Sequence, residues 1–207
     1  MSEAWPYQIP GPPVPRAGER DRSTILYAVA CLTTSDGLDR VSIGRLASAL
    51  GMSRAGLSAL FGSKQELQLA VVEEAARIFA EEVVRPALAA PPGLPQLTAV
   101  CEAFFVHLER RTFPGGCFMA SVALEMSGRD GPVGELVAEF QSRFGALIRD
   151  FAVTALARAE LAAGEDPDRL AFELNGIMLA TDTNFAQHDD PAVLDLARQI
   201  VRQRLAG

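Results

Sequence analysis

Apolar side chains recur at intervals of three and four residues along most of the chain, which places them on one face of an α-helix. The clearest such stripe consists of Leu67, Val71, Ala75, Ile78 and Val83. It belongs to a helix expected from about Ser63 to Val84, where Pro86 stops it. No strand-length window after residue 18 alternates apolar with polar residues between turn signals. The pattern predicts an all-α fold of about nine helices.

Helix start signals place several of these elements. The sequences EDPDRL and DDPAVL each put an aspartate, Asp166 or Asp190, as N-cap before a proline in the first turn. Pro132 begins a long helix expected to reach about residue 163. Shorter helices are expected over residues 95–110 and 117–126, between proline- and glycine-rich linkers.

Residues 42–61 are expected to form two short helices joined by a tight turn. Ser42 caps the first, over residues 43–50, and Ser53 caps the second, from residue 54 to about 61. Gly51 lies between them, where a left-handed backbone conformation costs glycine least. A helix, a glycine turn and a second helix make the DNA-reading helix-turn-helix unit, although an ordinary helical hairpin has the same pattern.

The second of these helices has an outer face of small side chains. The core shared by the two helices is expected to hold Leu46, Leu50, Met52, Leu57 and Leu60. The outer face is left with Arg54, Ala55, Gly56, Ser58 and Ala59. Small residues allow a helix backbone to sink into a major groove, where the Arg54 guanidinium reaches guanine or phosphate.

Charge is distributed unevenly along the chain. The formal net charge of −7 and the isoelectric point of about 4.9 argue, as totals, against a nucleic-acid partner. The segment from Arg16 to Lys64 nevertheless has a net charge of +3, and everything after Lys64 sums to −9. The acidic part would be repelled by DNA, which favours binding with the basic end forward.

The chain resembles the TetR-type transcriptional regulators. The stretch VSIGRLASALGMSRAGLSALFGSKQELQLAVVEEAA, preceded by ILYAVACLTTSDGLD, is similar to their N-terminal domain. A weaker similarity to the C-terminal domain of one branch lies in FPGGCFMASVALEMSGRDGPV and in the last 35 or so residues. The resemblance implies a DNA-binding domain over 19–64, with the family-type region extending to about 80, and a regulatory and dimerisation domain over 65–207. Residues 1–18, which the resemblance does not cover, are rich in proline and are expected to form a flexible arm.

The resemblance implies a homodimer that binds a near-palindromic operator, with repression as the usual mode. The residues expected to contact DNA are Ser42, Arg45, Ser53, Arg54, Ala55, Gly56, Ser58 and Lys64. Family members often carry an aromatic residue at the position of Ser58 and a histidine at that of Leu60, and an aromatic residue near Thr33. These departures predict weak DNA binding unless arginines of the arm region, Arg16, Arg20 and Arg22, add phosphate contacts.

By the same resemblance the last two helices, 169–185 and 191–205, pair with their copies in a four-helix interface. The residues assigned to this interface are Leu174, Met178, Phe185, Leu194, Ala197 and Val201. The helix over 63–84 would touch both domains and act as the lever between them. A ligand that prefers one conformation of this lever must change operator affinity.

The resemblance also implies a pocket for an effector in the C-terminal regulatory domain. Its candidate lining is Phe104, His107, Leu108, Phe118, Met119, Val122, Phe144, Leu147 and Asp182. This composition suits a small apolar or aromatic molecule, with His107 or Asp182 as polar anchors. Aromatic residues and methionines at helical spacing also describe an ordinary core.

Other function classes find less support. The chain has only two histidines and lacks nucleophile, nucleotide-binding and Glu-x-x-His metal motifs, so we expect no enzyme, no metal and no cofactor. Cys31, Cys101 and Cys117 leave open a thiol-based redox-responsive regulator, and the missing aromatic at Ser58 leaves open a helical dimeric interaction module without DNA binding. No signal peptide or membrane-spanning segment is evident, which predicts a cytoplasmic protein with no membrane partner.

Overall fold

The computed structural model describes residues 17–51 and 53–206, and every regular element within them is helical. The predicted arm up to residue 16, Met52, and the side chains of Arg20 and Leu50 lie outside the described residues. The elements are α1 (Ala17–Asp36), η1 (Leu38–Arg40), α2 (Ile43–Leu50), α3 (Arg54–Phe61), α4 (Lys64–Phe79), η2 (Ala80–Val84), α5 (Arg85–Ala89), α6 (Leu94–Glu109), α7 (Phe118–Met126), α8 (Pro132–Ala157), α9 (Pro167–His188) and α10 (Ala192–Ala206). Counting the continuous run α4–η2–α5 once and leaving out the three-residue η1 gives nine helices in the described residues, so the all-α prediction is confirmed.

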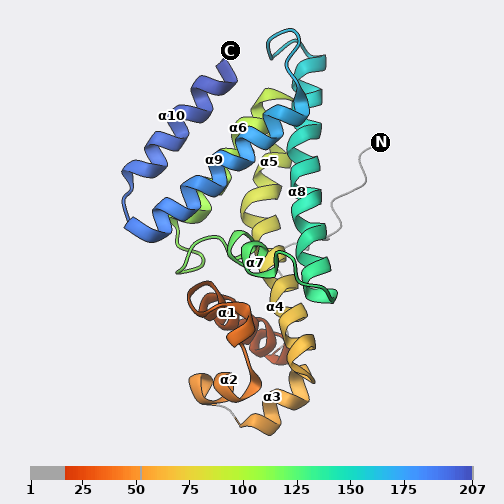
Figure 1. Ribbon diagram of the computed structural model, residues 1–207, viewed down its shortest axis with the longest axis vertical. Coiled ribbons are helices and arrows are strands. Elements are labelled where there is room, and N and C mark those ends of the chain that lie inside the picture. Colours follow the sequence, from red (N-terminus) through yellow and green to blue (C-terminus); the bar gives the residue numbers. More distant parts are fainter. Residues whose placement is uncertain (1–16, 52, 207) are drawn as a thin grey trace.

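The helices form a head and a body (Figure 1). The head, residues 17–61, comprises α1, η1, α2 and α3 at one end of the molecule, and the body, residues 80–206, comprises the helices from η2 to α10. α4 runs from the head into the body, and α7 lies where the two meet, in contact with α1, α4 and α8. The body is therefore connected to the head through two helices, α4 and α7.

The helix-turn-helix of the head is formed as predicted. The Ser42 and Ser53 side chains cap α2 and α3 by accepting hydrogen bonds from the backbone N–H of Arg45 at 3.3 Å and Gly56 at 3.0 Å. Gly51 has φ 63° and ψ 26°, the left-handed conformation that its position requires. The unit is therefore specified by local residues.

One residue of the expected shared core lies elsewhere. Leu46 and Leu57 are buried as expected, but Leu60 is 44 % exposed and Phe61 occupies the core position beside Leu57. Side chains four residues apart lie on the same face of a helix, so Phe61 faces the core together with Leu57. The large Phe61 side chain fills the place that the sequence pattern assigned to Leu60. Leu60 is consequently part of the outer surface of α3.

The helix that begins at Ser63 does not stop at Pro86. After Phe79 the chain forms one π-helical segment, η2, and continues through Pro86 in the first turn of α5 to Ala89. A proline lacks the N–H of the helical ladder and its ring crowds the carbonyl four residues earlier. The wider π turn just before Pro86 relieves that crowding, and the helix ends at Ala90, whose extended conformation is the one favoured before Pro91.

α8 is shorter than expected, ending at Ala157 instead of near residue 163. Ala159 takes a positive φ of 56° and turns the chain back. Glu160 then accepts a hydrogen bond from the backbone N–H of Leu94 at 2.8 Å and pairs with Arg158 at 2.9 Å. The end of α8 is thus set by a contact with the start of α6, which no local pattern reveals.

The apolar faces of α4, α6, α8, α9 and α10 meet in one continuous core of the body. Helices α9 and α10 pack along one side of this core, α9 against α8 and α6, and α10 against α6 and α9. In the part of the chain that the structure describes, no helix combines the length and apolar character needed to cross a bilayer.

Candidate DNA-binding surface and ligand cavity

The outer face of α3 is bare and small, as the sequence predicted. Arg54, Ala55, Ser58 and Ala59 are exposed, and Gly56 is half-buried. The Arg54 guanidinium extends over α2, where a Cβ added to Gly44 would lie 3.5 Å from its central carbon. The absence of a side chain at Gly44 therefore leaves room for this arginine between the two helices.

Ser42 and Ser53, two of the residues predicted to contact DNA, lie at helix N-termini, as does Ser63, which was not among them. Ser42, Ser53 and Ser63 each accept a backbone N–H, and Ser63 completes a capping box with Glu66, whose carboxylate accepts from the Ser63 N–H at 2.7 Å. A capping hydroxyl still has its own proton to donate. The positive end of the helix dipole favours an anion at these positions.

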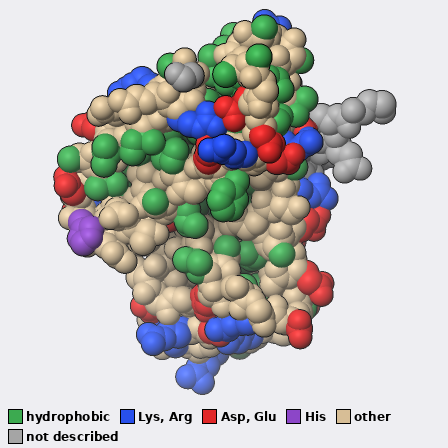
Figure 2. All heavy atoms as spheres, turned by 45° about the horizontal axis from the view of Figure 1, so that its top comes forward, with side chains coloured by type: hydrophobic (Ala, Val, Ile, Leu, Met, Phe, Trp, Pro, Cys, Tyr) green, Lys and Arg blue, Asp and Glu red, His purple; other side chains and the backbone are tan. Residues whose placement is uncertain are grey.

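The two other predicted cations are held in place by weak exposed contacts. Arg45 pairs with Asp36 at 3.0 Å, and Lys64 Nζ donates to the backbone carbonyl of Asp39 at 2.7 Å. Exposed pairs of this kind contribute about 0–1 kcal/mol, so a phosphate can replace them at little cost. Figure 2 shows Lys and Arg side chains at the lower end of the molecule, where the head lies.

The head is fastened to the body by polar contacts that sequence analysis missed. The Glu125 carboxylate of α7 accepts from the backbone N–H groups of Leu38 and Asp39 at 2.7 and 2.8 Å, at the start of η1. Arg129 forms an ion pair with Asp39. The partners are 86 to 90 residues apart in sequence, so no spacing or motif signals them.

The loop between α6 and α7 rests on α1. Tyr27 Oη donates to the carbonyl of Thr112 at 2.8 Å, and the N–H of Gly115 donates to Thr34 Oγ1 at 3.1 Å. The two backbones come so close that a Cβ at Gly115 would overlap the carbonyl of Thr34. The loop and α7 together therefore form the contact between body and head.

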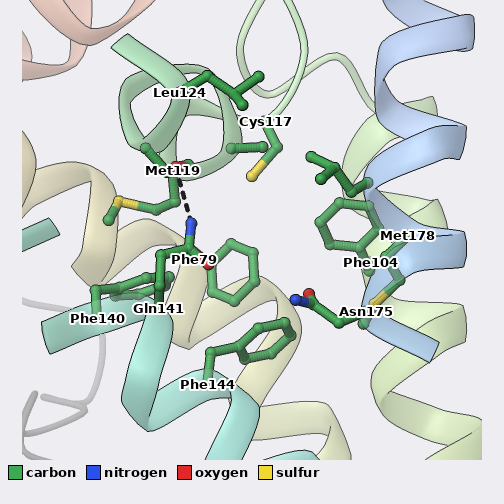
Figure 3. Close-up of a pocket in the computed structure, with 13 residues that line it drawn as sticks. Phe79, Phe104, Cys117, Met119, Leu124, Phe140, Gln141, Phe144, Asn175 and Met178 are labelled. Carbon is green, nitrogen blue, oxygen red and sulfur yellow. Dashed lines mark hydrogen bonds between the residues drawn. The ribbon is translucent and has the colours of Figure 1, made fainter. Parts of the chain in front are cut away.

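A cavity of about 140 Å³ lies in the body behind α7 (Figure 3). It is lined by Phe79, Phe104, Cys117, Met119, Ala120, Ala123, Leu124, Phe140, Gln141, Phe144, Asn175, Met178 and Leu179. Three of the predicted pocket residues, Phe104, Met119 and Phe144, are in this lining. The other wall residues come from α4, α8 and α9, from α7 itself and from Cys117 directly before it. Which residues of these helices meet depends on the fold.

The remaining predicted pocket residues do not line this cavity. Leu108, Phe118 and Val122 are buried core residues, and Leu147 is half-buried on α8 and packed against the core. They follow the same helical periodicity as cavity residues, because a core and a cavity wall are both apolar.

His107 and Asp182, the expected polar anchors, are committed to contacts within the protein. His107 is 2 % exposed, and its Nδ1 lies 2.6 Å from Glu82 Oε2, which also accepts from Thr112. Burial works to raise the pKa of Glu82, but the hydrogen bonds from His107 and Thr112 keep that pKa below its ordinary value. Asp182 accepts from the backbone N–H of Cys117 at 2.7 Å, and burial raises the pKa of Asp182 to about 6.

The cysteines show no sign of activation. Cys101 and Cys117 are buried, and burial raises the pKa of each thiol to about 12. Burial also raises the pKa of the half-buried Cys31. A reactive cysteine needs an accessible thiolate, so the thiol-based alternative gains no support from these sites.

The residues assigned to the dimer interface lie inside the protomer, which corrects that assignment. Leu174, Met178, Phe185, Leu194, Ala197 and Val201 are each at most 6 % exposed in the isolated chain. They pack in the protomer's own core and have no surface left for a partner. The outward faces of α9 and α10 instead carry Phe172, Leu179, Leu196 and Ile200. Figure 2 shows hydrophobic side chains gathered on the upper part of the molecule, away from the head.

Two family models match the chain. Residues 25–71 match the model described as bacterial regulatory proteins of the tetR family. Residues 93–201, more than half of the chain, match the model described as the tetracyclin repressor-like C-terminal domain. No curated protein sequence matches the chain significantly.

Solved structures of regulators share the fold. A TetR transcriptional regulator from Chloroflexus aurantiacus has 23 % identity and a TM-score of 0.81, covering 91 % of this chain and 96 % of its own. AibR, solved in complex with isovaleryl coenzyme A and operator DNA, has 20 % identity and a TM-score of 0.73, covering 91 % and 99 %. A TetR-family regulator from Streptomyces coelicolor has 19 % identity and a TM-score of 0.77, covering 92 % and 90 %. The head, the body and both family matches agree, and the chain belongs to the TetR family of DNA-binding transcriptional regulators.

Proposed function

We propose that this chain represses transcription as a homodimer that binds a near-palindromic operator, and that a small molecule in the cavity of the body controls it. The observation that carries the proposal is the exposed outer face of α3, which has only small side chains apart from Arg54. Ser53 caps the N-terminus of this helix. The family is one of regulators and not of enzymes. Because bacterial operators are cytoplasmic, we propose that compartment as its place of action.

In the proposed complex α3 enters the major groove. Ala55, Gly56 and Ser58 allow close approach of its backbone, and Arg54 contacts a guanine or a phosphate. Phosphates are bound at the helix N-termini by the remaining predicted contacts, Ser42, Arg45, Ser53 and Lys64. The exposed Leu60 adds an apolar contact at the outer surface of α3, where family members often carry histidine.

We propose that dimerisation uses the outward faces of α9 and α10. Phe172 is 80 % exposed and Leu196 is 56 % exposed, and Ile200 extends the apolar strip along α10. Two copies related by a two-fold axis would bury these side chains against their equivalents. The same axis would place the two α3 helices in successive major grooves, about 34–36 Å apart.

The proposed control follows from how the cavity is built. Its walls include Phe79 at the end of α4, and α7, whose Glu125 holds the start of η1 in the head. A ligand that favours one position of α4 and α7 would favour one spacing of the two heads. By thermodynamic linkage the operator then changes ligand affinity by the same factor. AibR, whose solved complex holds both isovaleryl coenzyme A and operator DNA, supports such a pairing of ligand and DNA in one fold.

Binding of the full-length protein to the duplex upstream of its own reading frame tests the proposal. Fluorescence anisotropy should give a dissociation constant that rises steeply with salt. Arg54→Ala should raise it about five- to hundredfold, the value of one base or phosphate contact. Arg143→Ala, on the body in α8, is the matched control and should leave binding unchanged.

A dissociation constant that does not depend on salt and is unchanged in Arg54→Ala would contradict the proposal. Absence of any binding to the duplex would favour the alternative of a helical dimeric module without DNA binding, for which the small Ser58 in place of an aromatic is the specific observation. A dissociation constant that shifts on mild oxidation and recovers in Cys117→Ser would instead favour the redox-responsive alternative.

A further inference from the structure

The size of the cavity limits what it can hold. Its volume of about 140 Å³ is close to that of an engineered apolar cavity of about 150 Å³ that binds benzene. The exposed side chains of Leu124, on α7, and Leu179, on α9, are part of the lining. The cavity therefore accepts one ring through an apolar opening between these two helices.

The walls favour an aromatic ring. Phe79 lies at the centre of a group of rings, with its centroid 5.1 Å from that of Phe144 and 5.3 Å from that of Phe140, both edge to face. Phe104 is 6.2 Å from Phe79 in the same orientation. Aromatic rings gain most from edge-to-face and offset contacts, so a planar ligand ring can extend this group.

The cavity has no charge to match a charged ligand. None of the described residues that line it is Asp, Glu, Lys, Arg or His. An ionised group placed there would lose its hydration without gaining a counter-ion, which is far more costly than burying a neutral polar group. A ligand that enters completely is therefore neutral.

The side-chain amides of Gln141 and Asn175 are polar groups of the lining, and they differ in how much hydrogen-bonding capacity they have left for a ligand. Gln141 Nε2 donates to the backbone carbonyl of Met119 at 3.1 Å, so part of its capacity is used. The Asn175 side chain makes no hydrogen bond to the described part of the chain and points from α9 into the cavity, towards Phe79 and Phe144 (Figure 3). Its amide offers one acceptor oxygen and two donor hydrogens to a ligand.

We propose that the cavity binds a neutral molecule with a single aromatic ring, and that Asn175 selects it through a hydrogen bond to its polar substituent. The binding of this ligand can be measured without DNA. Only the claim that the ligand controls operator binding rests on the proposed function. Asn175 is the specificity-determining residue, and the phenylalanine rings supply the apolar contact.

Calorimetry with three probes of one size tests the proposal on the full-length protein. Benzamide is neutral and polar, benzoate is its anionic counterpart, and ethylbenzene lacks a polar group. Benzamide should bind at least about tenfold more tightly than benzoate, because the anion is uncompensated. Asn175→Leu should weaken benzamide about five- to tenfold, the worth of one hydrogen bond, and leave ethylbenzene within about twofold.

Asn184→Leu is the matched control, since it makes the same change at an exposed position of the same helix. Asn175→Ser, checked with the others for an unchanged melting transition, guards against a folding defect of the leucine variant and should also weaken benzamide. Equal binding of benzoate and benzamide would overturn the proposal, as would an unchanged benzamide affinity in both Asn175 variants. Binding of isovaleryl coenzyme A in place of the neutral probes would overturn it too.

The operator assay separates this inference from the proposed function. Operator binding without binding of any neutral probe would overturn the ligand class and leave the DNA-binding function standing. Benzamide binding that depends on Asn175 but leaves operator affinity unchanged would support the ligand class and contradict the proposed control.

Discussion

At the scale of single residues, Asp182 is a buried carboxyl whose role is structural. It is 5 % exposed, and its oxygen accepts the backbone N–H of Cys117, directly before α7 begins. The side chain thus ties α9 to the start of α7. Ionisation at this depth is costly because the surroundings are apolar, and burial accordingly raises the pKa of Asp182.

This shift predicts how stability depends on pH. The Asp182 carboxyl releases its proton near pH 3.8 in the unfolded chain and near pH 6 in the folded one, so the folded state holds more protons between these values. The contribution of Asp182 to the free energy of unfolding therefore falls as pH rises from about 4 to 6, and is flat above. The full shift corresponds to about 3 kcal/mol.

Asp182→Asn removes this titration and keeps an oxygen for the Cys117 N–H. Urea unfolding at pH 7 should show the variant about 1–3 kcal/mol more stable than the parent, and the difference should shrink towards pH 4. Asp168→Asn, an exposed change in the first turn of the same helix, is the control. If Asp182→Asn were as unstable as Asp182→Ala at every pH, the negative charge of Asp182 would itself be needed for stability.

At the scale of elements, the contact between the α6–α7 loop and α1 decides how the head sits on the body. Gly115 lies against the backbone carbonyl of Thr34, where no side chain fits. Backbone cannot move aside as the end of a flexible side chain can. The loop and α7, whose Glu125 accepts hydrogen bonds from the backbone of η1, therefore together hold the head against the body.

Gly115→Ala should lower the free energy of unfolding by about 1–3 kcal/mol, because the added methyl group forces the two backbones apart. Gly145→Ala makes the same chemical change inside α8, where nothing lies within 4 Å of the new methyl group. It should raise stability by about 0.5–1 kcal/mol through helix propensity. Urea denaturation of both variants checks the opposite signs, and equal effects would argue against the close contact.

At the scale of the whole molecule, the proposed DNA-binding surface on α3 and the exposed apolar residues of α9 and α10 lie in different parts of the protein. The head carries exposed cations, and the outward faces of α9 and α10 carry exposed apolar residues (Figure 2). An apolar strip of this kind on a helical body indicates a protein partner. A second copy of the chain satisfies it while leaving both heads free for DNA.

Phe172→Asp should therefore convert the proposed dimer to a monomer, because it places a charge at the most exposed apolar residue of the strip. Sedimentation at micromolar concentration should show the change in mass, and operator affinity should fall by more than about tenfold as one head is lost. Leu88→Asp, at an exposed leucine of α5, is the control and should stay dimeric. A Phe172→Asp protein of unchanged mass would exclude this face as the interface.

Much of the head, and some helix starts of the body, could be predicted from sequence because their signals are local. The caps at Ser42, Ser53 and Asp166 and the turn at Gly51 each involve residues no more than four positions apart. Local steric and hydrogen-bonding rules are enough to place them. The helical periodicity that gives the all-α class is local in the same sense.

The cavity and the outward faces were decided only by tertiary structure. Periodicity shows that Leu174 and Met178 are on an apolar face of α9, but not whether that face meets the protomer's own core or a partner. The contacts that settle such questions join distant residues, such as Cys117 with Asp182 and Leu38 with Glu125, 65 and 87 positions apart. Sequence therefore determined the helices and the DNA-binding unit, whereas the packing of helices determined which apolar residues enclose a space, which are buried and which remain exposed.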